Sequence, residues 1–171
     1  MQVNDEVSSL LYDRVDHYIN CDIVINAYSG AGLLSAILCK SAKNVYGIEI
    51  VKEAHNNAEQ LKTNNNIHNL INICGRSEVE LPKILIKYPQ VSVVLDPPRK
   101  GVDNKLLNIV NTSTNIDKIV YISCSPNSLA KDIRLLNNYK IVRVELYDMF
   151  PNTSHVETLV LLTRKNVKDK I

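Results

Sequence analysis

One cysteine stands where a thiol could act as a nucleophile. Cys124 follows the apolar run VYIS and precedes a Ser-Pro pair, so it lies at the junction of a predicted strand and a predicted helix. Ser125 suits the N-cap of that helix, and Pro126 suits its first position. The positive end of a helix lowers the pKa of a nearby thiol, which favours the nucleophilic thiolate. The competing interpretation is a small buried apolar residue, the commoner fate of a free cysteine.

Two carboxylates are predicted to reach the same place. Asp96 ends the apolar run VSVVL and is followed by the proline-stiffened turn PPRKG, whereas Glu157 is near the head of the apolar run HVETLVLL. If that last strand runs antiparallel to the others, its beginning lies at the sheet edge that holds Cys124. A glutamate at the head of an apolar strand is costly to bury without a partner or a function. We therefore expect Asp96, Cys124 and Glu157 to converge.

The turn YSGAG, which begins at Tyr28, predicts a nucleoside pocket. The backbone at Gly30 can approach a ligand closely, and Glu49 follows about 20 residues later at the end of the next predicted strand. An acidic residue at that distance is suited to ribose hydroxyls. An ordinary tight turn and a solvated glutamate are the alternatives. The pattern does not choose between NAD and S-adenosylmethionine, although the missing GxGxxG spacing disfavours a dinucleotide.

A mostly parallel sheet is needed to position these residues, because ligands of such sheets bind outside the carboxyl ends of the strands. Short apolar runs alternate with helical patterns along the chain, as this architecture requires. The expected strands cover Asp22–Ala27, 44–50, 70–74, 91–96, 118–123, and then 140–147 and 155–163 as an antiparallel pair. The expected helices cover Asp5–Tyr18, Leu33–Ser41, Lys52–Asn64, a segment with apolar positions at Val79, Leu81, Ile84 and Leu85, and a segment that follows Ser125.

Composition narrows the class of protein. A chain of 171 residues that is 45% hydrophobic is long enough for one domain with a substantial core. The net charge of +2 predicts that any RNA contact comes from a local patch and is weak and salt-sensitive. Arg99 and Lys100 could form such contacts or could be exposed solubilising charges. No apolar run is long enough to span a bilayer, so we expect no membrane contact.

The other cysteines and the histidines indicate no further chemistry. The remaining cysteines (Cys21, Cys39 and Cys74) are interpreted as structural, and without a CxxC pair they predict reduced thiols in the cytoplasm. The four histidines are scattered, so no metal site is expected.

Three segments, DPPRKG, YISCSPNSLAKD and DMFPNTSHVETLVLL, resemble in order and spacing the catalytic domain of bacterial RNA (uracil-5-)-methyltransferases, and the ribosomal RNA branch in particular. The resemblance implies an α/β fold with a Rossmann-like, seven-stranded class I methyltransferase sheet, mostly parallel with an antiparallel last strand and with helices on both faces. It also implies that residues 1–171 form one catalytic domain, without the amino-terminal RNA-binding domain of the family.

The resemblance implies a role for each candidate site residue. Cys124 would be the nucleophile and Glu157 the base, while the S-adenosylmethionine contacts would include Gln2, Tyr28, Gly30, Glu49 and Asp96. The implied reaction is transfer of the methyl group to C5 of a uridine in RNA through a covalent cysteine adduct.

Two departures from the family pattern leave alternatives open. The first turn reads NAYSGAG where DLYCGTG is usual, so Asn26 replaces an acid, and SCSP stands where SCNP is usual. A catalytically weak or inactive cofactor-binding remnant is therefore one alternative. An amino-directed methyltransferase is another, but Arg99 stands where that class needs an aromatic residue after the two prolines.

Overall fold

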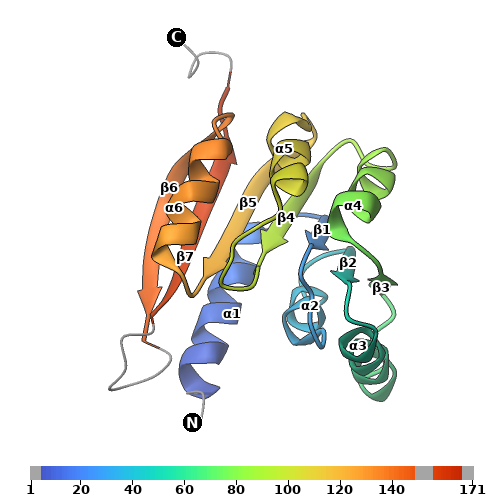
Figure 1. The fold of residues 1–171 in the computed structure, drawn as a ribbon. Helices are drawn as coiled ribbons and strands as arrows, with labels where there is room; N and C mark the ends of the chain where they lie inside the picture. Colours follow the sequence, from blue (N-terminus) through green and yellow to red (C-terminus); the bar gives the residue numbers. More distant parts are fainter. Residues whose placement is uncertain (1–4, 149–155, 167–171) are drawn as a thin grey trace.

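Seven strands form one sheet with helices on both faces in the computed structural model, which describes residues 5–148 and 156–166 (Figure 1). In chain order the elements are α1 (Asp5–Ile19), β1 (Ile23–Asn26), α2 (Leu33–Leu38), β2 (Asn44–Glu49), α3 (Lys52–Asn64), β3 (Leu70–Cys74), α4 (Ser77–Leu85), β4 (Val91–Leu95), α5 (Asn104–Thr112), β5 (Ile116–Ser123), α6 (Pro126–Leu135), β6 (Tyr139–Tyr147) and β7 (Glu157–Arg164).

The strand order is β3-β2-β1-β4-β5-β7-β6. Strands β1 to β5 pair in parallel, whereas β7 is antiparallel both to β5 and to β6. The predicted mostly parallel sheet with an antiparallel last strand is therefore confirmed, and so is the antiparallel pairing of the last two strands. Because β7 runs against the others, its first residues lie at the carboxyl edge of the parallel strands.

Each face of the sheet has its own apolar core. Helices α1 and α2 cover one face, where Leu11 and Leu34 pack with Val94 and Val120. Helices α4, α5 and α6 cover the other face, as Figure 1 shows, and their buried side chains include Leu107. Successive side chains of a strand point to opposite faces of the sheet. Residues that lie two positions before or after Val94 on β4, or Val120 on β5, therefore point to the face that α1 covers.

Helix α5 was not expected between the fourth and fifth strands. Asp103 is its N-cap, and the Asp103 carboxylate accepts a hydrogen bond from the Lys105 backbone N–H at 2.8 Å. Its buried residues are Leu106, Leu107 and Val110, so both the cap and the apolar spacing were present in the sequence. The helix matters for the site because its start forms part of the cavity wall described below.

The other predicted elements are present, with ends that differ by a few residues. Val79 was expected on the apolar face of α4, but its side chain is 48% exposed, and Ser77 is buried instead. Among residues 5–148 and 156–166, no helix is both long enough and apolar enough to cross a membrane.

Candidate functional site

A cavity of about 840 Å³ opens at the carboxyl edge of the sheet, beside β1, β2 and β4. Of the predicted site residues, Tyr28, Gly30, Glu49 and Asp96 line it. Gln2 lies outside the described residues. Cys124 directly follows β5, Glu157 begins the neighbouring strand β7, and neither is part of the described cavity wall.

Glu49 holds the glycine turn. One oxygen of its carboxylate accepts a hydrogen bond from the Gly30 N–H at 2.9 Å, and the other accepts one from the Val51 N–H at 2.7 Å. Gly32 has a φ of +87°, and a Cβ built there would lie 2.8 Å from the Ala58 Cβ of α3. The turn therefore needs glycine at position 32, and it presents its backbone to the cavity.

Asn26, a residue of the cavity lining, carries a buried acceptor without a partner in the described part of the chain. Its side chain is 1% exposed, and its Nδ2 donates to the Ser35 hydroxyl at 3.1 Å. Its Oδ1 is buried and has no hydrogen-bond partner among the described residues. A buried acceptor without a partner is unfavourable, so a ligand with a donor group would stabilise it.

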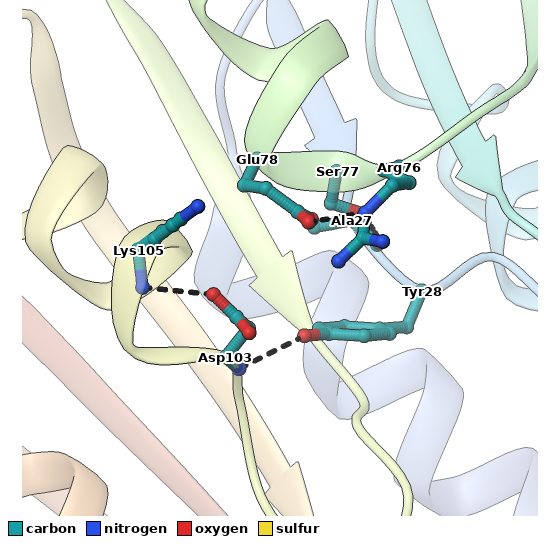
Figure 2. Close-up of polar contacts among 7 residues, drawn as sticks. All are labelled: Ala27, Tyr28, Arg76, Ser77, Glu78, Asp103 and Lys105. Carbon is teal, nitrogen blue, oxygen red and sulfur yellow. Dashed lines mark hydrogen bonds and ion pairs between the residues drawn. The ribbon is translucent and has the colours of Figure 1, made fainter.

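Figure 2 shows polar contacts in the cavity wall near α4 and α5. The Tyr28 hydroxyl accepts a hydrogen bond from the Asp103 N–H at 3.5 Å, next to the start of α5. The Ser77 hydroxyl donates to the Ala27 carbonyl, which ties α4 to the end of β1. Burial raises the pKa of Tyr28, so its phenol is neutral at physiological pH.

Asp96 lies in an unusual electrostatic environment at the end of β4. Burial, and secondarily the nearby Glu157 carboxylate, raise the pKa of Asp96 to about 7. Burial also raises the pKa of Glu157, and the Arg99 guanidinium opposes that shift. The Glu157 carboxylate therefore disfavours ionisation of Asp96, which is consistent with the predicted convergence.

The pairing of β5 with β7 brings the chain positions of Cys124 and Glu157 to the same edge of the sheet. Ser123 pairs with Thr158, so Cys124 and Glu157 are the next residues along the two antiparallel chains. Val120, Ile122 and Leu159 point to the face that α1 covers. Because side chains two positions apart on a strand share a face, the alternation predicts the same face for Cys124, two residues after Ile122, and for Glu157, two residues before Leu159.

A hydrogen-bonded serine pair fixes the backbone around Cys124. The Ser123 hydroxyl donates to the Ser125 carbonyl at 3.0 Å and accepts from the Ser125 N–H at 3.0 Å, so it spans the half-buried Cys124. Ser125 is the N-cap of α6, because its side chain accepts from the Ser128 N–H at 3.4 Å, and Pro126 begins the helix. The predicted cap is confirmed.

Asp132 attaches the PPRKG loop to α6, and it was not predicted as important. Asp132 is 2% exposed, and its carboxylate accepts hydrogen bonds from the Val102 N–H at 2.7 Å and the Tyr121 hydroxyl at 2.6 Å. Gly101 passes so close that a Cβ there would lie 2.6 Å from Asp132 Oδ2. The loop after Asp96 is thus held against the helix that follows Cys124.

Tyr12 was also missed. It lines the cavity together with Asp96, and its pKa is raised by burial first and then by Asp96 and Glu157. It lies on α1 beside the buried Leu11, and nothing in the helical pattern shows how α1 is placed relative to the strand ends. Within the part of the chain that the structure describes, no group of three or more potential metal ligands gathers.

Comparison with solved structures identifies the class of fold. An rRNA methylase from Streptococcus thermophilus matches with a TM-score of 0.70 at 14% identity, covering 92% of this chain and 95% of that one. The Pyrococcus abyssi tRNA (uracil-54, C5)-methyltransferase, in complex with S-adenosyl-L-homocysteine, matches with a TM-score of 0.79 at 27% identity, covering 92% of this chain and 38% of that one. The chain therefore has the Rossmann-like fold of methyltransferases.

Sequence comparison identifies the family. Residues 6–165 match the model of the tRNA (uracil-5-)-methyltransferase family, so the chain belongs to this family and the resemblance is confirmed. An uncharacterized RNA methyltransferase of Enterococcus faecalis is 40% identical over 169 residues, which are 95% of this chain and 37% of the relative. One of Bacillus cereus is 42% identical over 170 residues, or 95% of this chain and 36% of the relative. The chain thus spans little more than a third of these relatives.

Proposed function

We propose that the chain transfers a methyl group from S-adenosylmethionine to C5 of a uridine in RNA, with Cys124 as nucleophile and Glu157 as base. The observation that supports this most is the β5–β7 pairing, which ends with Ser123 opposite Thr158, so that Cys124 and Glu157 are the next residues along the two chains. Glu157 also contributes to the raised pKa of Asp96. Membership of the family and the named activity of the Pyrococcus abyssi relative favour the same reaction. A ribosomal RNA substrate stays a prediction.

The cavity suits the proposed cofactor. Its volume of about 840 Å³ lies in the range of small-molecule sites. If a small movement of its neighbours opens the buried Asn26 Oδ1 to the cavity, this unpaired oxygen accepts a hydrogen bond from the methionine ammonium group. Glu49 already accepts two backbone N–H groups, yet each carboxylate oxygen has a second lone pair for a ribose hydroxyl. When bound, S-adenosylmethionine supplies an electrophilic methyl group on its sulfonium sulfur.

Cys124 makes the uracil ring reactive. C5 of uracil is a weak nucleophile, and addition of the Cys124 thiolate to C6 moves the C5–C6 electron pair toward O4 as an enolate. C5 can then form its bond to the methyl carbon. Because Cys124 and Glu157 are the next residues beyond the Ser123–Thr158 pair, the adduct would form near a candidate base.

Glu157 completes the reaction. Its carboxylate accepts the proton from C5, the electrons of that C–H bond restore the C5–C6 double bond, and the C6–S bond breaks to return the Cys124 thiolate. Burial raises the pKa of Glu157, which makes its ionised form a stronger base. Uridine has therefore lost a C5 proton and gained a methyl group, and the enzyme returns to its starting state once Glu157 releases that proton to water.

The covalent step can be tested with 5-fluorouridine. RNA transcribed with this nucleotide has no C5 proton to lose, so the reaction stops as an adduct that survives denaturing electrophoresis. We expect an adduct that requires S-adenosylmethionine, that disappears in Cys124→Ala, and that persists in the control Cys74→Ala, whose thiol is exposed at the end of β3. An adduct or turnover in Cys124→Ala would contradict the mechanism.

The alternative of a cofactor-binding module without catalysis makes a different prediction. Such a chain would bind S-adenosylmethionine in calorimetry, with loss of binding in Asp96→Ala, but it would form no adduct with fluorinated ribosomal or transfer RNA, even when an RNA-binding partner domain is supplied. The replacement of the family's usual acid by Asn26 motivates this alternative.

A further inference from the structure

Tyr12 is an aromatic side chain in the site that the mechanism above does not use. Helix α1 buries Leu11, Val15 and Ile19 against the sheet. Tyr12 packs, partly buried, against the same cluster, and it also lines the cavity beside Asp96. Its ring is therefore held in place by packing while one side faces the cavity.

The other tyrosine on this helix that packs against the same cluster behaves differently. The Tyr18 hydroxyl donates to the Glu145 carboxylate, on the outer strand β6. Within residues 7–148 and 156–166, no hydrogen bond holds the Tyr12 hydroxyl in the same way. Tyr18 thus has a structural partner, whereas Tyr12 has open space in front of it.

The position of Tyr12 corresponds to the substrate end of the site. The cofactor candidates Tyr28 and Glu49 belong to β1 and β2, whereas Tyr12 interacts electrostatically with Asp96 after β4 and with Glu157 on β7. In the sheet order, β5 lies between β4 and β7, so Cys124 lies between those two carboxylates. A uracil attacked by Cys124 must occupy the space that these residues surround.

We propose that Tyr12 is a substrate-positioning residue whose ring stacks on the uracil and holds C6 over the Cys124 sulfur. This inference rests on the proposed function. A base that leaves its helix to reach an active site loses its neighbours' stacking, and an aromatic side chain can replace that contact. Stacking requires a flat ring, so phenylalanine should substitute for tyrosine and leucine should not.

Kinetics with RNA and S-adenosylmethionine test the role. We expect Tyr12→Leu to raise the KM for RNA by about 10- to 100-fold, the usual value of one stacked base. The S-adenosylmethionine Kd should stay within about twofold of wild type, and Tyr12→Phe should restore the RNA KM to within about threefold. The matched control is Tyr18→Leu, which makes the same change on the same helix and should leave the RNA KM unchanged.

A photochemical experiment tests the contact without turnover. RNA carrying 5-iodouridine crosslinks on irradiation to an aromatic ring stacked on the base, and Cys124→Ala protein prevents the competing thiol adduct. In the Cys124→Ala protein we expect a crosslinked peptide that contains Tyr12. The same peptide should crosslink in the double variant Cys124→Ala, Tyr12→Phe, but not in the double variant Cys124→Ala, Tyr12→Leu.

The outcomes separate this inference from the proposed function. If the fluorinated RNA forms its adduct but the crosslink maps elsewhere, or if Tyr12→Leu weakens S-adenosylmethionine as much as RNA, the stacking role is wrong and the function stands. If wild-type protein forms no adduct with any RNA tested, the proposed function fails and the role of Tyr12 fails with it.

Discussion

Removal of the Asp132 carboxylate should destabilise the protein more than any single hydrogen bond would suggest. The side chain is 2% exposed, and it accepts from two buried donors, the Val102 N–H at 2.7 Å and the Tyr121 hydroxyl at 2.6 Å. In Asp132→Ala both donors lose their partner, at about 1–3 kcal/mol each, so the free energy of unfolding should fall by about 2–6 kcal/mol. A loss of about 3 kcal/mol would lower the Tm of a domain of this size by about 6–12 °C.

Two further variants calibrate that value. Tyr121→Phe removes one of the two donors and should cost about 1–2 kcal/mol. Asp22→Ala removes an exposed carboxylate that pairs with Lys43, and its cost should stay below about 0.5 kcal/mol.

Urea denaturation of the four proteins gives the comparison. Asp132→Ala should be the least stable, followed by Tyr121→Phe, with Asp22→Ala close to wild type. If Asp132→Ala costs no more than Tyr121→Phe, then the Val102 N–H contributes nothing. In that case the conclusion that Asp132 holds the loop against α6 is wrong.

Three other properties can be predicted from the structure. Because burial and a neighbouring carboxylate raise the pKa of Asp96 to about 7, the folded state favours its protonated form. The unfolding free energy of wild type relative to Asp96→Asn should therefore fall by up to about 4 kcal/mol as the pH rises from about 4 to 7, and a flat difference in urea titrations would contradict this. Gly32→Ala should cost about 2–4 kcal/mol in thermal unfolding because its Cβ would collide with α3, whereas Gly30→Ala, with open space around it, should cost only about 1 kcal/mol for its positive φ. Lys100 and Lys131 line the cavity, and replacing either by alanine should lower the salt slope of RNA affinity by about 1. An unchanged slope in binding assays at several KCl concentrations would exclude a phosphate contact.

The residues at the strand ends could be predicted because their positions follow from backbone periodicity. Asp96, Cys124 and Glu157 each end or begin an apolar run, and parallel strands bring their carboxyl ends to one edge. The direction of β7, inferred from the short connection before it, was then enough to place its first residue, Glu157, at the sheet edge where β5 ends.

The residues that were missed depend on how separate elements pack. Tyr12 reaches the site only because of the way α1 lies across β5 and its neighbours, and Asp132 matters only because the PPRKG loop turns back onto α6. Neither arrangement leaves a local pattern in the sequence. Helix α5 is a different case, because its Asp103 cap and its apolar spacing were readable and were overlooked.

The place of β7 between β5 and β6 affects how the protein is made on the ribosome. Strand β6 is synthesised before β7, yet it joins the sheet only through β7. Until β7 has emerged, β5 has an open edge and β6 has no partner, and unpaired apolar strands favour aggregation. The proposed base, Glu157, belongs to that same strand. All described residues of the cavity wall precede it in the sequence, and the last of them is Lys131. A nascent or proteolytically shortened chain that ends before residue 157 would therefore be an aggregation-prone protein that keeps the cofactor cavity but has no base to finish the reaction.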